Sequence, residues 1–123
     1  MKILVLIIQK KWFDKIMSGE KKQEFRECRP TTYKKYGECD KEGFSIMDKD
    51  GKFIPKKYDA IQFYVGYAKD RERALVEVTS AEIEVFTDDN GEIIVYDYYG
   101  RDFWAAQVVY NLGKIISHGI GKE

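Results

Sequence analysis

The segment from Gly19 to Arg26 places a lysine, a carboxylate and an arginine close together where a loop meets a predicted strand. Glu24 and Arg26 project to the same side of an extended strand, because side chains repeat every two residues. Lys21 has the opposite parity and joins them only if the backbone turns just after Gly19, which a glycine permits. Such a cluster suits a polar, planar or anionic ligand.

The charges of this cluster indicate how it would bind. A carboxylate beside two cations is favoured in its ionised form, and it can accept hydrogen bonds from a base or an amide. Lys21 and Arg26 can bind phosphate or a carbonyl oxygen. The alternative is a surface ladder of ion pairs, each of which contributes little to stability.

A second candidate carboxylate, Glu77, stands in the middle of the apolar run 74–79. Glutamate is unfavourable there unless its face of the strand is wet, paired or functional. Exposure on a half-buried sheet is the commoner case. If Glu77 instead points into the same cavity as Lys21, the two can act as a general acid/base unit.

Tyr64 and Tyr67 flank Gly66 at the end of a predicted strand. A glycine lets a ligand approach the backbone, and the tyrosines offer ring faces for base stacking. The alternative is ordinary core packing, since the chain holds nine tyrosines.

No metal or cofactor site is expected. His118 is the only histidine and has no cysteine at ligand spacing, so a zinc site is not predicted. Cys28 and Cys39 form no metal-binding pattern and are interpreted as reduced thiols of a cytoplasmic protein. The apolar run 3–8 is too short to span a membrane.

Length and charge indicate a single domain, residues 1–123, with a polar insertion at about 38–57. Lys+Arg and Asp+Glu both number 21, so the whole chain has no net attraction for nucleic acid. Residues 1–57 nevertheless hold 15 basic and 9 acidic side chains, and residues 58–123 hold 6 and 12. A ligand-facing surface is therefore expected in the basic half, although uneven solvated charge is an equal alternative.

Periodicity predicts one early helix and five or six strands. The helix is expected near 10–18, where apolar residues recur on one side and Gly19 follows as a stop. A short helical segment is expected within 31–36. Strands are expected at residues 3–8 (buried on both faces), 21–28, 58–67, 74–87, 92–97 and about 104–117. The phase of strand 74–87 changes near residues 80–82, as at a bulge. The fold class is α+β, mostly β, as a small mixed barrel-like sheet.

Several of these segments, taken in order, resemble the ASCH domain family, a relative of the PUA RNA-binding fold. The resemblance covers nearly the whole chain except residues 38–57. It rests on the helix with Trp12 and Ile16, Gly19-x-Lys21-x-x-Glu24-x-Arg26, Tyr58-Asp59-Ala60-Ile61-x-Phe63-Tyr64, and Leu112-Gly113-Lys114-Ile115.

The resemblance implies a PUA-like pseudo-barrel of five to six strands, with a ligand cleft beside the segment from Lys21 to Arg26. Members of the family are thought to bind RNA or modified nucleotides. One small branch hydrolyses N4-acetylcytidine with a lysine, a threonine and a glutamate. Lys21 and Glu77 match two of these, but Glu24 stands at the threonine position, and a carboxylate cannot replace a hydroxyl nucleophile without changing the mechanism.

Three functions follow as hypotheses. The first is a module that binds RNA, single-stranded nucleic acid or a modified nucleoside through Lys21, Glu24, Arg26, Tyr64 and Tyr67. The second is a small hydrolase, of the N4-acetylcytidine amidohydrolase or ribonuclease type, in which Lys21, Glu24 and Glu77 are catalytic. The third is a protein-interaction module whose basic half docks an acidic partner.

Overall fold

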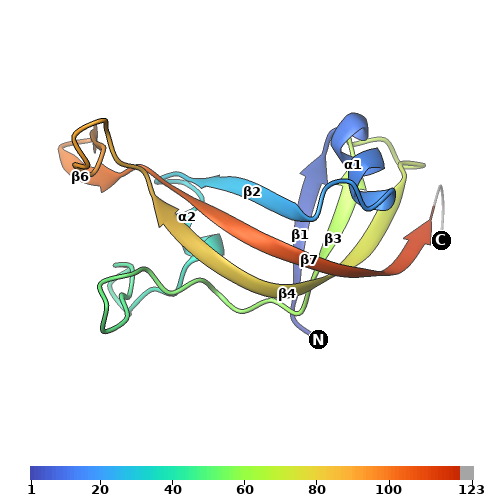
Figure 1. Cartoon of the computed structure of the whole chain (residues 1–123), viewed down its shortest axis with the longest axis horizontal. Coiled ribbons are helices and arrows are strands. Elements are labelled where there is room, and N and C mark those ends of the chain that lie inside the picture. The colour runs from blue at the N-terminus through green and yellow to red at the C-terminus, as the bar shows by residue number, and fades with distance from the viewer. Residues whose placement is uncertain (120–123) are drawn as a thin grey trace. The chain divides into compact units, whose positions relative to one another are not determined.

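The computed structural model describes residues 1–119 and is mostly β (Figure 1). Its elements are β1 (Ile3–Ile8), α1 (Lys10–Met17), β2 (Gln23–Cys28), α2 (Tyr33–Tyr36), β3 (Ala60–Val65), β4 (Arg73–Val85), β5 (Val95–Tyr98), β6 (Arg101–Trp104) and β7 (Ala106–Gly119). Five strands form one sheet in the order β1-β3-β4-β7-β2, and β5 pairs with β6. β1 and β3 are parallel, whereas β3 and β4 are antiparallel, so the sheet is mixed.

The predicted fold class, α+β and mostly β with one early helix, is confirmed. The five-stranded sheet is open: within residues 1–119, β1 and β2 are its two edges and do not pair with each other. The sheet is therefore not a closed barrel.

The chain divides into two compact units, which we describe separately. The first unit comprises Met1–Glu24, Lys57–Ser80 and the chain from Tyr110 onward, and the second comprises Phe25–Lys56 and Ala81–Val109. The sequence of the first unit holds 12 basic and 8 acidic side chains, a net charge of +4. The second holds 9 and 13, a net charge of −4. The two units therefore carry net charges of opposite sign.

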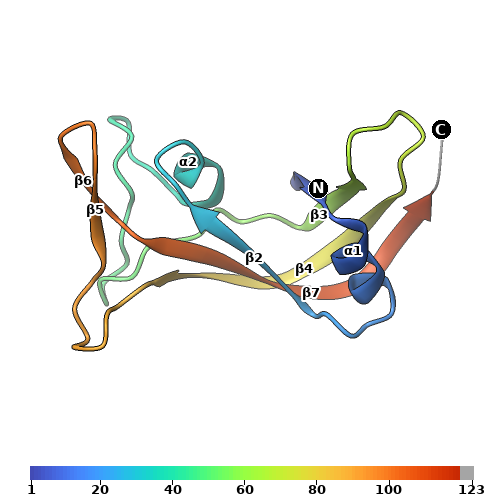
Figure 2. The same cartoon turned by 90° about the horizontal axis from the view of Figure 1, so that it is seen from above.

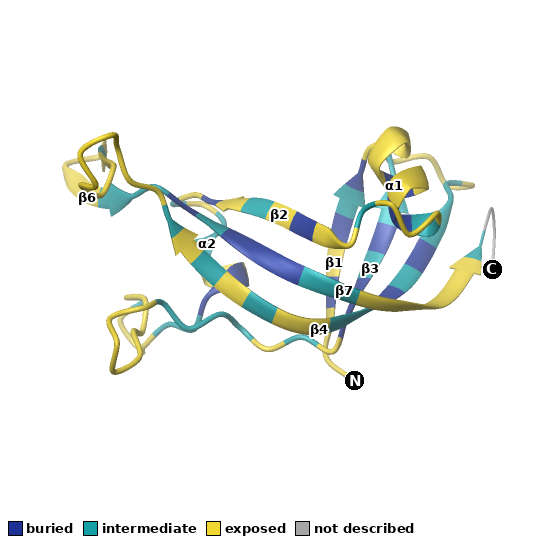
Figure 3. Cartoon of the chain, in the orientation of Figure 1, coloured by how far each residue is buried: buried dark blue, intermediate teal, exposed yellow. Residues whose placement is uncertain are grey.

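In the first unit, α1 packs its apolar side inward and lies beside β3 (Figure 2). Phe13 and Ile16 are buried, and Gly19 follows at φ +82°, a conformation that favours glycine and ends the helix. β1 was expected to be buried on both faces, and this is wrong. Buried and exposed positions alternate along it (Figure 3), and Val5 is 51% exposed, so only one face of β1 is covered.

Three turns of the second unit have the same hydrogen-bonding pattern; two lie in the polar insertion 38–57 and the third begins at Asp88. Asp40, Asp48 and Asp88 each accept two backbone N–H groups on a single carboxylate oxygen, from the residues two and four positions later. A glycine with positive φ follows three positions after each aspartate. These Asp-x-x-Gly turns are stabilised by the aspartate side chain, as in Asx turns.

The β5–β6 hairpin was not predicted from the sequence. The strand expected at 92–97 begins only at Val95, and the chain then turns at Tyr99 and Gly100, both of which have positive φ. Two consecutive residues in this conformation form the tight turn that matches strand twist, but Asn-Gly or Asp-Gly is its usual signal. A tyrosine there gives no such signal, so the hairpin was missed.

The predicted phase change in the long fourth strand is confirmed. Ala74 and Val76 are buried at even positions, whereas Ala81, Ile83 and Val85 are the more buried residues of the strand's second half, at odd positions. The change falls close to the boundary between the two units at Ser80. Each half of β4 therefore presents its apolar side chains to its own unit.

Candidate functional site

The loop before β2, which contains Lys21, borders a cavity in the first unit. We call this space, about 420 Å³ in volume, the lysine cavity, because Lys21, Lys22 and Lys114 line it. Ile16 at the end of α1 and Val76 on β4 contribute apolar walls, together with Met17, Leu112 and Ile115. No carboxylate is among the described residues that line it. The lining therefore combines apolar residues with lysines.

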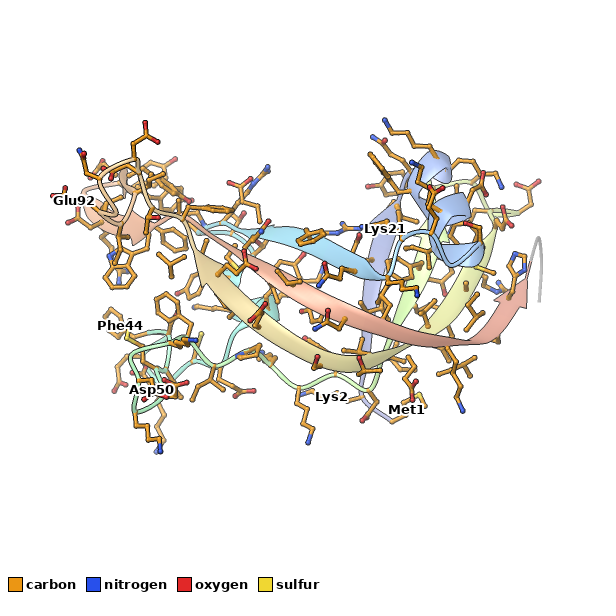
Figure 4. All side chains as sticks on the ribbon, viewed as in Figure 1. Met1, Lys2, Lys21, Phe44, Asp50 and Glu92 are labelled. Carbon is orange, nitrogen blue, oxygen red and sulfur yellow. The ribbon has the colours of Figure 1, made fainter. Side chains whose placement is uncertain are left out.

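Local backbone geometry brings Lys21 to this cavity. The backbone N–H of Gly19 donates to the Ile16 carbonyl at 3.1 Å, and that of Lys21 donates to the Lys15 carbonyl at 2.9 Å. These hydrogen bonds fold the chain back against the last turn of α1 before β2 begins. Figure 4 shows Lys21 at this corner. The turn predicted just after Gly19 is therefore present.

Lys21 and Glu24 form a largely buried ion pair within the first unit. The Lys21 Nζ lies 3.2 Å from the Glu24 Oε1, and the two side chains are 17% and 6% exposed. The Lys21 ammonium also donates to the Gln23 carbonyl. Of the charged residues that the structure describes, only Glu24 is buried. Its carboxylate therefore fixes the position of the Lys21 ammonium at the edge of the cavity.

No family model, curated protein or solved structure matches this chain.

Glu77 does not line the lysine cavity. Val76 lines it, and consecutive side chains of a strand point to opposite faces, so Glu77 projects to the other face of β4. The backbone N–H of Lys114 donates to the Glu77 Oε1 at 3.4 Å. The same oxygen lies over Gly113, at 2.2 Å from where an added Cβ would stand.

The other predicted ligand residues lie elsewhere. The guanidinium of Arg71 stacks on the ring of Tyr64, 4.1 Å from its centroid, and donates to the Gly66 carbonyl at 3.1 Å. Tyr67 is 83% exposed. Neither tyrosine lines the lysine cavity. Arg26 is half-buried on β2 and belongs to the second unit.

Lys22 and Lys114 were not predicted as site residues. Lys114 did appear in the Leu112-Gly113-Lys114-Ile115 segment that carries the family resemblance, but spacing gave it no role. Both ammonium groups belong to exposed residues, so they are open to a ligand from solvent. Only the pairing of distant segments, 21–22 with 112–115, reveals that they border one space.

Two features are absent from the described residues: a cluster of metal ligands and a helix that could span a membrane. Within residues 1–119, no group of three or more histidine, cysteine or acidic side chains is placed to hold a metal ion. Among the same residues, neither helix has the length and apolar character needed to cross a bilayer.

A charged cluster outside the cavity links three segments of the first unit. The Glu72 carboxylate lies 2.6 Å from the Lys10 Nζ and 2.8 Å from the His118 Nε2, and Lys10 also pairs with Asp14 at 2.9 Å. Hydrogen bonds from Lys10 and then His118 lower the pKa of Glu72 below its ordinary value of 4.5. The hydrogen bond to Glu72 raises the pKa of Lys10 above 10.5.

These shifts predict how stability depends on pH. A lowered carboxyl pKa stabilises the folded state above about pH 4.5, and this contribution is lost as the pH falls through the folded pKa of Glu72. The raised pKa of Lys10 stabilises the folded state fully below pH 10.5, and this contribution is lost as the pH rises through the higher folded pKa of Lys10. We expect Glu72→Gln to reduce both losses in urea unfolding measured across pH. Asp70→Asn, an exposed carboxylate nearby, is the control, and equal curves for both variants would contradict the prediction.

Proposed function

We propose that the first unit binds RNA, single-stranded nucleic acid or a modified nucleotide, with the anionic part of the ligand at the lysine cavity. The observation that carries the proposal is the cavity lining: Lys21, Lys22 and Lys114 border an apolar space that no described carboxylate lines. Phosphate oxygens suit the ammonium groups, and a sugar or base suits the apolar walls. The net charge of +4 on this unit favours approach of an anion.

The lysines have different roles in this proposal. The charge of Lys21 is offset by Glu24, so Lys21 supplies a hydrogen-bond donor held at a fixed position. Lys22 and Lys114 are exposed and supply the net positive charge that contacts phosphate. Glu24 acts as a positioning residue. A direct hydrogen bond from a base to Glu24, contact with Arg26, and stacking on Tyr64 or Tyr67 stay predictions.

The same proposal includes the family assignment. The order of the helix, the Gly19-to-Arg26 element and the closing Leu112-to-Ile115 segment supports an ASCH-like domain of the PUA-like superfamily, acting in the cytoplasm. The mostly β fold with one early helix agrees with that assignment. Hydrolysis is not proposed, because Glu77 projects to the face of β4 opposite to that of Val76, which lines the cavity.

The test is a titration with single-stranded RNA, uridine 5′-monophosphate and uridine at low and high salt. We expect RNA and the nucleotide to bind more tightly than the nucleoside, and binding to weaken as salt rises. Lys22→Gln and Lys114→Gln should each weaken RNA binding and reduce the slope of log affinity against log salt by about 0.7. Lys69→Gln, an exposed lysine of the same unit outside the cavity, is the control.

Two outcomes would overturn the proposal. One is the absence of salt-sensitive binding to any of the three probes. The other is an equal loss of affinity in the Lys69→Gln control, which would indicate general attraction to a basic surface rather than a site.

A further inference from the structure

The second unit contains a cavity of its own, with a lining unlike that of the lysine cavity. We call this space the aromatic cavity; its volume is about 330 Å³, within the range of about 300–1,000 Å³ that small-molecule sites occupy. Six aromatic side chains line it: Tyr33, Phe44, Phe53, Tyr98, Phe103 and Trp104.

Three segments far apart in the sequence build this lining. The ring of Phe53 in the insertion lies 5.7 Å from that of Trp104 on β6, and the ring of Tyr33 on α2 lies 5.4 Å from that of Phe103. The Tyr33 hydroxyl donates to the Gly43 carbonyl at 2.6 Å. Figure 4 shows Phe44 in this unit, on the same insertion. The ring pairs meet at interplanar angles of 60° and 66°, so the walls resemble a cage more than a slot between parallel rings.

The charged residues that line the cavity are two carboxylates and one arginine. Glu38 and Asp102 line it, and their carboxylates make no hydrogen bond or ion pair with the residues that the structure describes. Asp97 stands directly opposite Asp102 in the β5–β6 pair, and like charges in that position are destabilising. Burial, and then Glu27, raises the pKa of the Cys28 thiol in the lining to about 11, so this thiol adds no charge at neutral pH.

One cation already uses an aromatic face of this cavity. The guanidinium of Arg101 lies 5.3 Å from the centroid of the Phe44 ring. Cations are attracted to ring faces at this distance, and aromatic cages recognise alkylated ammonium groups in this way. The unit carries a net charge of −4, which favours a cation and opposes a phosphate ligand.

We propose that the aromatic cavity binds a small organic cation that carries an alkylated ammonium group. The ring faces would hold the cation, and Asp102 and Glu38 would offset its charge. The ligand would also relieve the repulsion between Asp97 and Asp102. This site is separate from the lysine cavity, and its ligand has the opposite charge, so either proposal can fail without the other.

The probes are choline and its neutral isostere 3,3-dimethylbutan-1-ol, titrated against the full chain by calorimetry. The two molecules have the same shape, so a preference for choline measures the effect of charge. We expect choline to bind about tenfold more tightly. Equal affinity for the two probes, or no saturable binding of choline, would overturn the proposal.

Substitutions in the cavity should act in opposite directions. Asp102→Asn and Glu38→Gln should each weaken choline binding about threefold, because each removes an anion. Arg101→Gln should strengthen it, because it removes a cation and frees the Phe44 ring. Asp89→Asn changes the charge of the same unit outside the lining and should leave the affinity unchanged.

Trp104 tests the contribution of the rings. Trp104→Phe keeps a ring of lower attraction for cations and should weaken choline binding by a few fold, whereas Trp104→Leu should weaken it about tenfold. Circular dichroism of each variant verifies folding, and the Phe variant keeps the test valid if the Leu variant unfolds. The proposal is overturned if Asp89→Asn weakens binding as much as Asp102→Asn, or if Trp104→Phe has no effect.

Discussion

Lys21→Met is expected to reduce the free energy of unfolding by about 3 kcal/mol, the lower end of the cost of breaking a buried ion pair. The substitution removes an ammonium that lies 3.2 Å from a carboxylate only 6% exposed. Water cannot replace the ammonium freely at that depth, so the Glu24 carboxylate loses solvation without full compensation. Urea unfolding followed by circular dichroism measures the change.

A double substitution of Lys21 and Glu24 separates the energy of their interaction from the cost of leaving one charge buried without the other. Glu24→Met alone should also destabilise the chain, since it leaves the Lys21 ammonium only 17% exposed and without that carboxylate. Replacing both members of a buried pair by apolar residues of similar size is often nearly neutral. We therefore expect the double variant to be more stable than either single variant, with a coupling energy of about 2 kcal/mol.

The chain contains a matched control. Lys15 and Glu20 form an ion pair with the same 3.2 Å separation, but their side chains are 50% and 65% exposed. Exposed pairs contribute about 0–1 kcal/mol, so Lys15→Met should cost little. If Lys21→Met costs no more than Lys15→Met, then Glu24 does not hold Lys21 in place, and the positioning role proposed for Glu24 fails.

Local signals in the sequence were sufficient to predict most elements. The helical spacing of Phe13 and Ile16 and the glycine at position 19 predicted α1 and its end. Alternation of side chains predicted β3, and the phase change of the long strand predicted how β4 divides between the units. Each of these signals lies within about a dozen residues, because side-chain spacing and helix termination depend on residues that are close in the sequence.

Other features depend on contacts that no local pattern encodes. The face to which Glu77 projects is fixed by the strand phase that places Val76 at the cavity. Lys114 joins Lys21 only because β7 returns beside β2, where the Leu112 N–H donates to the Lys22 carbonyl at 2.9 Å. The rings of the aromatic cavity likewise come from α2, the insertion, β5 and β6, which show no common periodicity. The positions of such sites are determined by contacts between segments that are far apart in the sequence.

Gly113→Ala is expected to destabilise the chain by about 1–3 kcal/mol, the usual cost of overpacking. A Cβ at this position would stand 2.2 Å from the Glu77 Oε1 and 2.9 Å from the Thr79 Cγ2. The glutamate can swing away, but the β-branched threonine has little freedom. Gly119→Ala on the same strand is the control, because its added Cβ would meet Arg73 only at 3.5 Å, an ordinary contact.

The rescue experiment tests where Glu77 points. Glu77→Ala alone should cost little, since it removes one long hydrogen bond of 3.4 Å from the Lys114 amide. Combined with Gly113→Ala, it should restore about half of the lost stability, because the Thr79 contact persists. Urea unfolding of the four proteins in this cycle provides the coupling energy. Additive losses would mean that Glu77 does not lie over Gly113.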